Sequence, residues 1–284
     1  MFLTLAACRP ASRDVGQTEL RGRTMGTTYT VKLVPPVRDA TTAEAIHEAV
    51  KDELDAVDSR MSTYRDDSEL SRFNASSSTD WFAVSSETAQ VVHEAIEIGR
   101  ISGGALDVTI EPLVRLWNFG PGASENEGVP SDDQIEEARR STGLHLLDAR
   151  LDPPAIRKDR PEVHVDLSSI AKGYAVDRVA DLLDRVADLL DRRGHDNYMV
   201  EVGGEVRSRG LNRQGRPWQI AIERPIGGAR EIQSVLPLGT RAMATSGDYR
   251  NYFEKDGRRY SHLIDPRTGR PIAHGLVSAT VLAD

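Results

Sequence analysis

One short segment changes its hydrophobic period, and this change constrains the fold more than any other feature of the sequence. The segment is Val163 to Ala175, VHVDLSSIAKGYA. Val163, Val165 and Leu167 alternate with polar residues, the period of two that indicates a half-buried strand. From Ser168 onward the apolar residues recur three and four positions apart, as on one face of a helix. The sequence therefore predicts a strand that passes directly into a helix, with a serine available to cap the first turn.

Polar side chains gather at this predicted junction. Asp166, Ser168, Ser169 and Lys172 would all lie near the first turn of the helix. A helix N-terminus attracts anions through its unpaired N–H groups and its dipole. Lys172 would favour a phosphate there, and Asp166 with a hydroxyl group can hold a divalent cation or a polar ligand edge. The pattern predicts a diphosphate or nucleotide site, while an ordinary capped helix with Lys172 in water fits the same residues. It is not a P-loop, because the spacing of that motif is absent.

Composition restricts the class of protein. The 284 residues can form one large domain or two modest ones. With 39% hydrophobic and 28% charged residues, the chain has the balance of a soluble globular protein. The formal net charge of -8 argues against nucleic-acid binding. An anionic ligand would need a local basic or metal-containing site, because the overall field repels it.

The N-terminus resembles a processing signal. Met1 to Cys8, MFLTLAAC, ends in the small-residue pattern of a bacterial lipoprotein cleavage site, although the basic n-region is missing. A chance cysteine in an apolar tail is the alternative. If the pattern is real, Cys8 is acylated and the following residues tether the chain to the membrane surface. We therefore predict a lipoprotein signal remnant and tether over residues 1–18 and a folded domain over residues 19–284. As Cys8 is the one cysteine, no internal disulfide can form.

Short strands and turn signals recur along the rest of the chain. Glu19 to Val34 is rich in Thr, Tyr and Val around a Met-Gly-Thr interruption, which predicts two strands joined by a sharp bend. Asp256-Gly257 is a favoured hairpin turn. Because short strands outnumber long helices, we predict an α+β fold with mixed, mainly antiparallel sheets flanked by helices. Further strands are predicted at Trp81–Val84, Leu144–Leu147, Ala155–Lys158, Tyr198–Val202, Glu205–Arg209, Trp218–Glu223 and Ile232–Leu238.

Three further positions are candidates for ligand binding. Tyr64 lies in a polar loop and can stack on a planar ring, although such a tyrosine also serves packing. Asp107 follows the glycine pair Gly103-Gly104, where backbone can approach a ligand closely. His262 is delivered by the second strand of the predicted hairpin to a turn, and either a base or a satisfied structural histidine fits that place.

The predicted helix after Lys172 contains a duplication. DRVADLL occurs at Asp177–Leu183 and again at Asp184–Leu190. Seven residues add about 10.5 Å of helix and turn its apolar face by only about 20°. We expect the second copy to extend the helix outward without shifting the candidate site.

Several segments, taken in order, resemble the ApbE-like family of bacterial FAD:protein FMN transferases. They run from about Thr24 to the last residue of the chain. They are TMGTTY, MSTYRDDSELSRFN, GGALDVTIEPLVRLWNFG, VDLSSIAKGYAVD, VEVGGE and ATSGDYRNYFEKDGRRYSHLIDPRTGRPI.

The resemblance implies a Mg2+-dependent enzyme that cleaves the pyrophosphate of FAD, releases AMP and transfers FMN to a threonine hydroxyl of a partner protein. It implies that His262 is the base and that Ser169 offers an oxygen to Mg2+. It also implies an acceptor flavoprotein subunit of a membrane redox complex, and a place on the periplasmic side of the inner membrane, anchored through Cys8. The residues that would line FAD are Met25, Tyr64, Ala105, Leu106, Asp107, Asp166, Lys172 and Ile264.

Two other functions use the same residues. In a metal-dependent FAD pyrophosphatase, water replaces the threonine, and in a lipid-anchored flavin-binding protein there is no turnover. The family's metal-site aspartate and hydroxyl group come from a helix beyond Asp284. We therefore expect a C-terminally incomplete fold that, without that helix, binds FAD weakly and transfers FMN poorly.

Overall fold

The structure is a computed structural model that describes residues 14–123, 128–189, 196–226 and 231–284. Cys8 and its lipoprotein-like pattern lie outside these residues, so the anchor and the domain boundary stay predictions. Within the described ranges, no helix is both long and apolar enough to cross a bilayer.

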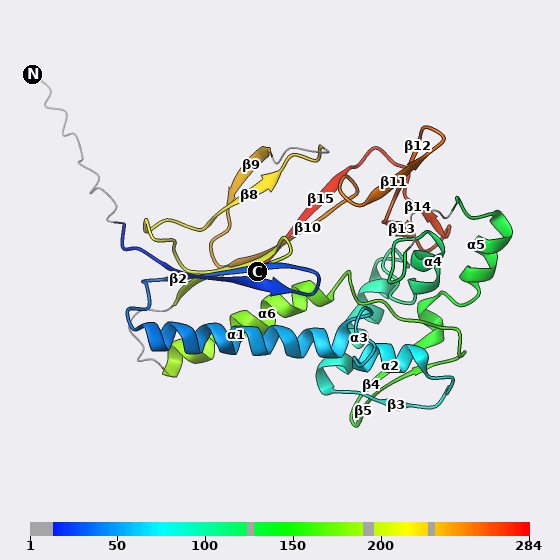
Figure 1. The fold of residues 1–284 in the computed structure, drawn as a ribbon, viewed down its shortest axis with the longest axis horizontal. Coiled ribbons are helices and arrows are strands. Elements are labelled where there is room, and N and C mark those ends of the chain that lie inside the picture. Colours follow the sequence, from blue (N-terminus) through cyan, green and yellow to red (C-terminus); the bar gives the residue numbers. More distant parts are fainter. Residues whose placement is uncertain (1–13, 124–127, 190–195, 227–230) are drawn as a thin grey trace, which may run out of the picture.

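A six-stranded antiparallel sheet forms the centre of the molecule (Figure 1). Its strand order is β1-β2-β6-β7-β10-β15, so β1 and β15, from the two ends of the sequence, form its opposite edges. The predicted bend after the first strand is confirmed, because Met25 and Gly26 both adopt positive φ (48° and 70°) between the first two strands. The strands are β1 (Thr18–Thr24), β2 (Thr27–Val34), β6 (Asn197–Val202), β7 (Glu205–Arg209), β10 (Arg241–Gly247) and β15 (Ser278–Ala283).

Two long helices cover one face of this sheet, α1 (Ala40–Met61) and α6 (Ala171–Leu189) (Figure 1). Apolar side chains recur on α1 at helical spacing, and Val50 and Leu54 are almost completely buried. They pack in one core cluster with Val179 of α6 and Val200 of β6. This core fixes α6, and with it Lys172, against the sheet.

A second group of elements lies beside the first and contributes Asp107 and His262 to the candidate site. The short sheet β3-β5-β4 packs against α3, and the antiparallel hairpins β11–β12 and β13–β14 lie near α4 and α5 (Figure 1). The helices are α2 (Glu69–Ala75), α3 (Ser86–Ile101), α4 (Glu111–Leu116) and α5 (Asp132–Arg139). The strands of this group are β3 (Phe82–Ala83), β4 (Leu147–Leu151), β5 (Pro154–Lys158), β11 (Tyr252–Lys255), β12 (Arg258–Ser261), β13 (Ile264–Asp265) and β14 (Arg270–Pro271). A separate hairpin, β8 (Gln219–Glu223) with β9 (Ile232–Pro237), packs on the central sheet, where Ile220 and Ile222 join a core cluster with Val206 and Met243.

The α+β prediction is confirmed, and every strand pair among the described residues is antiparallel. The predicted strand at Leu144–Leu147 is wrong over most of its length. Leu144–Leu146 forms a 3-10 turn, and β4 begins at Leu147.

The predicted strand at Val163–Leu167 is also wrong. This segment is extended but pairs with no strand in the described part of the chain, and the helix begins at Ala171 after a turn. The alternation still reports burial correctly, because Val163, Val165 and Leu167 are all 0% exposed. No neighbouring strand pairs with the backbone here; the side chain of Asn74 bonds both backbone groups of Val165, and Lys158 bonds the carbonyl oxygen of Val163.

The duplicated heptad occupies the second half of α6. In the first copy, Val179 and Leu183 are buried, whereas Val186 of the second copy is only half-buried. The two copies make equivalent ion pairs with β7. Asp177 lies 2.8 Å from Arg207, and Asp184 lies 2.8 Å from Arg209.

Deleting Asp184–Leu190 is expected to leave the affinity for FAD, the ligand that the family resemblance implies, nearly unchanged. The deletion brings Asp191 into the sequence position of Asp184, so the partner of Arg209 is replaced. α6 packs on β6, which begins at Asn197, so the shortened helix would end close to the strand that follows. Titration of FAD into both proteins measures this.

Deleting Asp184–Asp188 provides the matched control. Because α6 ends at Leu189, removing five residues puts Leu189 directly after Leu183, in the sequence position of Asp184. Arg209 then loses its ion-pair partner, so this variant should unfold at lower temperature. A marked loss of FAD affinity in the seven-residue deletion would show that the second copy is coupled to the site.

Candidate active site

His262 lies directly after β12 and is held by the opposite strand of its hairpin. Its Nδ1 lies 3.0 Å from the carbonyl oxygen of Asn251, and its backbone N–H donates to the same oxygen at 3.1 Å. A carbonyl can only accept, so Nδ1 carries the proton and Nε2 keeps its lone pair. Among the described residues, Nε2 has no hydrogen-bond partner.

The charge state of His262 also suits a base. Burial lowers the pKa of the imidazole, and the ammonium of Lys172 lowers it further, whereas the Asn251 carbonyl and the Asp248 carboxylate raise it. The net direction is below the ordinary value of 6.5, so His262 is neutral at neutral pH.

A row of aromatic rings supports His262. Trp117 stacks on Tyr260 at 5.6 Å between centroids, and Tyr260 stacks on Phe253 at 5.0 Å. Phe119 lies 5.6 Å from Phe253 and meets His262 edge-on at 6.3 Å. The row ties the β11–β12 hairpin to the α4 region, so the position of the imidazole is fixed from two sides.

Lys172 lies in the first turn of α6 and is bound to Glu205 on β7. Its Nζ lies 2.7 Å from Glu205 Oε1. The turn between β6 and β7 passes close to the stem of Lys172, because a Cβ on Gly203 would lie 3.1 Å from Lys172 Cδ. Gly203 also has a φ of 58°, a backbone conformation that favours glycine. The ammonium is therefore held in place against β7, instead of pointing freely into water.

Asp166 borders the same region. Its backbone N–H donates to Val108 O at 2.8 Å, and its Oδ1 accepts from Ser168 N at 2.7 Å. The ring of Tyr64 is 69% exposed and available for stacking. Desolvation first, and the charge of Asp166 second, raise the pKa of the Tyr64 hydroxyl.

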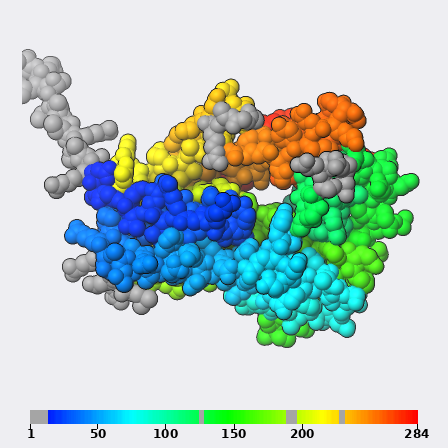
Figure 2. Space-filling view, in the orientation of Figure 1, coloured from blue at the N-terminus to red at the C-terminus, as the bar shows by residue number. Residues whose placement is uncertain are grey.

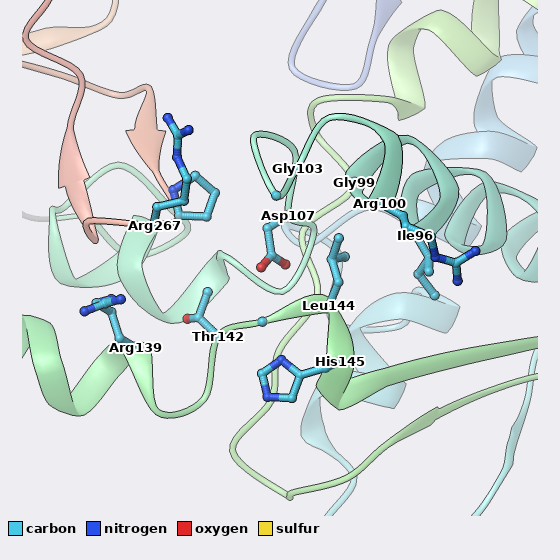
Figure 3. Close-up of a pocket in the computed structure, with 13 residues that line it drawn as sticks. Ile96, Gly99, Arg100, Gly103, Asp107, Arg139, Thr142, Leu144, His145 and Arg267 are labelled. Carbon is cyan, nitrogen blue, oxygen red and sulfur yellow. The ribbon is translucent and has the colours of Figure 1, made fainter.

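Asp107 is almost buried beside a cleft of about 510 Å³. Its Oδ1 accepts from Thr109 N at 2.8 Å and from Thr109 Oγ1 at 2.6 Å. Burial nevertheless raises the pKa of the carboxyl group. Figure 3 shows the carboxylate among cleft residues that include Thr142 and Leu144. Ala105 and Leu106 precede it in the loop after α3, and this loop contacts the Asp166 segment through the bond from Asp166 N to Val108 O.

The remaining predicted site residues differ in exposure. Met25 lies at the tip of the β1–β2 hairpin, half-buried against the core. Figure 2 shows the surface hollowed between this blue hairpin and the orange β11–β12 hairpin. Ile264 is 8% exposed and packs against Leu113 and Trp117, so its side chain belongs to a small core cluster. Ser169 is exposed in the turn before α6.

The described residues contain no group of three or more His, Cys, Asp or Glu side chains that could hold a metal ion by themselves. Sequence reasoning missed Glu205 and Asp248. Glu205 follows the turn glycines of VEVGGE, and a carboxylate placed directly after such a pair was the signal that could have identified it.

Comparison with known proteins identifies the family. The model of the ApbE family matches residues 25–284. The chain belongs to the ApbE family. An FAD:protein FMN transferase of Vibrio cholerae serotype O1 is 50% identical over 283 residues, which are 99% of this chain and 80% of that protein. The FAD:protein FMN transferase of Escherichia coli K12 is 41% identical, over 94% of this chain and 74% of that protein.

Solved ApbE structures share the fold. The flavin transferase ApbE from Vibrio cholerae has a TM-score of 0.81 at 47% identity, over 94% of this chain and 81% of that one. The apo form of the flavinyl transferase ApbE from Pseudomonas stutzeri has a TM-score of 0.80 at 39% identity, over 94% of this chain and 79% of that one. The family resemblance seen in the sequence is confirmed.

Replacing Gly99 by alanine is expected to destabilise the protein and displace the Ala105–Asp107 loop. Gly99 lies in α3, where a Cβ would lie 2.7 Å from Leu106 O and 2.0 Å from Leu144 Cδ1. An alanine normally stabilises a helix interior by about 0.5–1 kcal/mol over glycine, so the expected sign is reversed here. Urea denaturation measures the change.

Gly173→Ala is the control, because a Cβ at this helical position meets no atom within 4 Å. It should show the ordinary gain in stability. If Gly99→Ala is as stable as Gly173→Ala, then Leu106 yields without cost and the loop is not held by this contact.

Proposed function

We propose that this ApbE-family chain is an FAD:protein FMN transferase. The observation that carries the proposal is the orientation of His262, whose Nδ1 is held by Asn251 O so that Nε2 is available as a proton acceptor. Such a transfer needs a base near neutral pKa, a nucleophile in line with the leaving group, and positive charge on the diphosphate. The family membership supports the same reaction, since the relatives carry that name.

In the proposed reaction, Nε2 of His262 accepts the proton of an acceptor threonine hydroxyl. The hydroxyl oxygen forms a bond to the phosphorus of the FMN half of FAD, and the bond between that phosphorus and the bridging oxygen breaks. The electron pair leaves with the bridging oxygen, so AMP is released and a phosphoester remains on the threonine. Lys172 neutralises negative charge on the diphosphate during this exchange.

We also propose that the reaction uses Mg2+. Magnesium commonly takes one or two protein oxygens and completes its shell with phosphate and water. The exposed hydroxyl of Ser169 and the half-exposed carboxylate of Asp166 fit such a donor set, although they supply few ligands of their own. When bound, the cation neutralises diphosphate charge.

The acceptor is proposed to be a flavoprotein subunit of a membrane redox complex, and the chain is proposed to be anchored through Cys8 on the periplasmic side of the bacterial inner membrane. The lipoprotein-like end of MFLTLAAC supports the anchor. Incorporation of radiolabelled palmitate in bacterial cells, compared between the native chain and Cys8→Ala, tests it.

Incubation with FAD and Mg2+, with and without a threonine-bearing acceptor protein, tests the function itself. A transferase releases AMP and places covalent flavin on the acceptor. AMP release at the same rate without any acceptor would instead indicate the pyrophosphatase. Retention of FAD without AMP would indicate a flavin-binding protein.

A further inference from the structure

A single side chain replaces a neighbouring strand beside the segment that carries Asp166. Asn74 Nδ2 donates to Val165 O at 2.9 Å, and Val165 N donates to Asn74 Oδ1 at 2.8 Å. An amide offers one donor and one acceptor in the same plane, as a strand backbone does. Val165 is 0% exposed. Without this two-way contact, its backbone groups would be buried unpaired.

Lys158 gives further support to the contact between Asn74 and Val165. Its Nζ donates to three backbone oxygens, at 3.1 Å to Asn74, 3.0 Å to Pro161 and 3.2 Å to Val163. The side chain is 0% exposed and lies 5.1 Å from the centre of the Phe73 ring. Burial lowers the pKa of this ammonium group. All three donors are used to join the end of α2 to the segment before Asp166.

Three ligand-bearing segments meet at this contact. Asp166 follows Val165 directly, and its own N–H binds the loop of Asp107 through Val108 O. The loop of Tyr64 is fastened to α2, because Ser68 Oγ and Ser71 Oγ both donate to Ser62 O, at 2.6 and 3.1 Å. Asn74 lies near the end of α2. A shift at Asn74 would therefore change how Tyr64, Asp166 and Asp107 face one another.

We infer that Asn74 is a positioning residue for FAD binding, which it supports by fixing Val165 and thereby the carboxylate of Asp166, with Lys158 as its second support. The inference rests on the proposed function for the identity of the ligand. Asn74 acts through Val165 and Asp166, and not directly on the transferring phosphorus. It therefore affects the affinity for FAD and not the proton transfer to His262.

Asn74→Ala and Asn197→Ala form a matched pair for testing this role. Asn197 also joins two backbone segments, as its Oδ1 accepts from Leu211 N at 2.7 Å and its Nδ2 donates to Val34 O at 3.4 Å. It lies at the start of β6, whereas the candidate site lies at the other end of this strand, beside Gly203. Both variants lose a bridging amide, so both should have a lower urea midpoint.

Only Asn74→Ala should weaken FAD binding, by roughly 10- to 100-fold, the usual effect of losing a group that orients a ligand-binding residue. Fluorescence titration with FAD in Mg2+ measures the Kd. At saturating FAD, the transfer rate should return close to that of the native chain. Equal Kd values for the two variants, or a loss of rate that saturation does not restore, would overturn the inference.

Asn74→Asp separates geometry from simple loss of packing. Aspartate keeps the shape of asparagine, so this variant should fold even if Asn74→Ala does not. Its carboxylate, however, places an acceptor oxygen against the carbonyl oxygen of Val165. The carboxylic acid form regains a donor, so the contact stabilises the protonated form and the carboxyl pKa is higher when the contact is made. The affinity deficit should therefore shrink as the pH falls. Lys158 is present in both variants, so its titration cannot distinguish them. The loss of FAD affinity in Asn74→Ala, relative to the native chain, should not shrink as the pH falls.

The outcomes distinguish this inference from the proposed function. If the native chain neither binds FAD nor releases AMP, the proposed function fails. If the native chain binds FAD and Asn74→Asp shows the same deficit at every pH, the amide contact has no positioning role and the inference fails.

Discussion

Replacing His262 by alanine is expected to reduce FMN transfer by about 10²- to 10⁴-fold, the usual contribution of a positioned base, while FAD binding stays close to that of the native chain. The base acts on the threonine proton and not on the bound substrate. His93→Ala is the control, since His93 lies on α3 outside the aromatic row that holds His262. Covalent flavin on the acceptor, measured by in-gel fluorescence, gives the rate, and FAD titration gives the Kd.

The pH dependence of transfer provides a second readout for His262. Its pKa lies below the ordinary 6.5 because burial disfavours the charged imidazolium. The neutral base therefore persists to lower pH, and the rate should fall only as the pH drops through this lowered pKa. In His262→Ala that acid limb should vanish. Equal losses of binding and transfer would make His262 a structural or FAD-contacting residue instead.

The sequence predicted the class of fold because its signals are local. The turn residues Met25 and Gly26, and the pair Asp256-Gly257, favour hairpins whatever surrounds them. All four residues adopt positive φ, and the strands that they join are antiparallel as expected. The alternation of apolar and polar residues likewise predicted that Val163 and Val165 are buried. The strand assignment at these residues was wrong because the partners of their backbone are the side chains of Asn74 and Lys158, which hydrophobic period does not report.

The site was predictable in its residues but less so in their contacts. Lys172 was placed at a helix start from the local pattern, yet its partner Glu205 lies 33 positions away on β7, and only the packing of α6 on the sheet brings the two together. Ile264 entered through the family resemblance alone. Its side chain is in a core cluster, so a contact with FAD would have to come from its backbone.

Replacing Lys172 by methionine is expected to weaken FAD binding by about 10- to 100-fold. A hydrogen bond to a charged group contributes roughly 1.5–3 kcal/mol, and each 1.4 kcal/mol is about a tenfold change in Kd. Methionine keeps the length and apolar stem of the side chain but removes the ammonium. FAD titration at increasing ionic strength measures the effect. The native chain should lose affinity as salt screens the lysine, and the variant should lose much less.

Glu205 determines how large this loss is. Within the described part of the chain, Glu205 Oε2 has no hydrogen-bond partner, and Lys172 is the ion-pair partner of Oε1. Lys172→Met therefore leaves a half-buried carboxylate without a counter-charge, close to where we propose that the diphosphate binds. Adding Glu205→Gln removes that negative charge, so the double variant should bind FAD more tightly than Lys172→Met alone, though less tightly than the native chain. If the double variant binds no better than the single one, the repulsion from Glu205 is absent and the lysine acts on FAD independently of its partner.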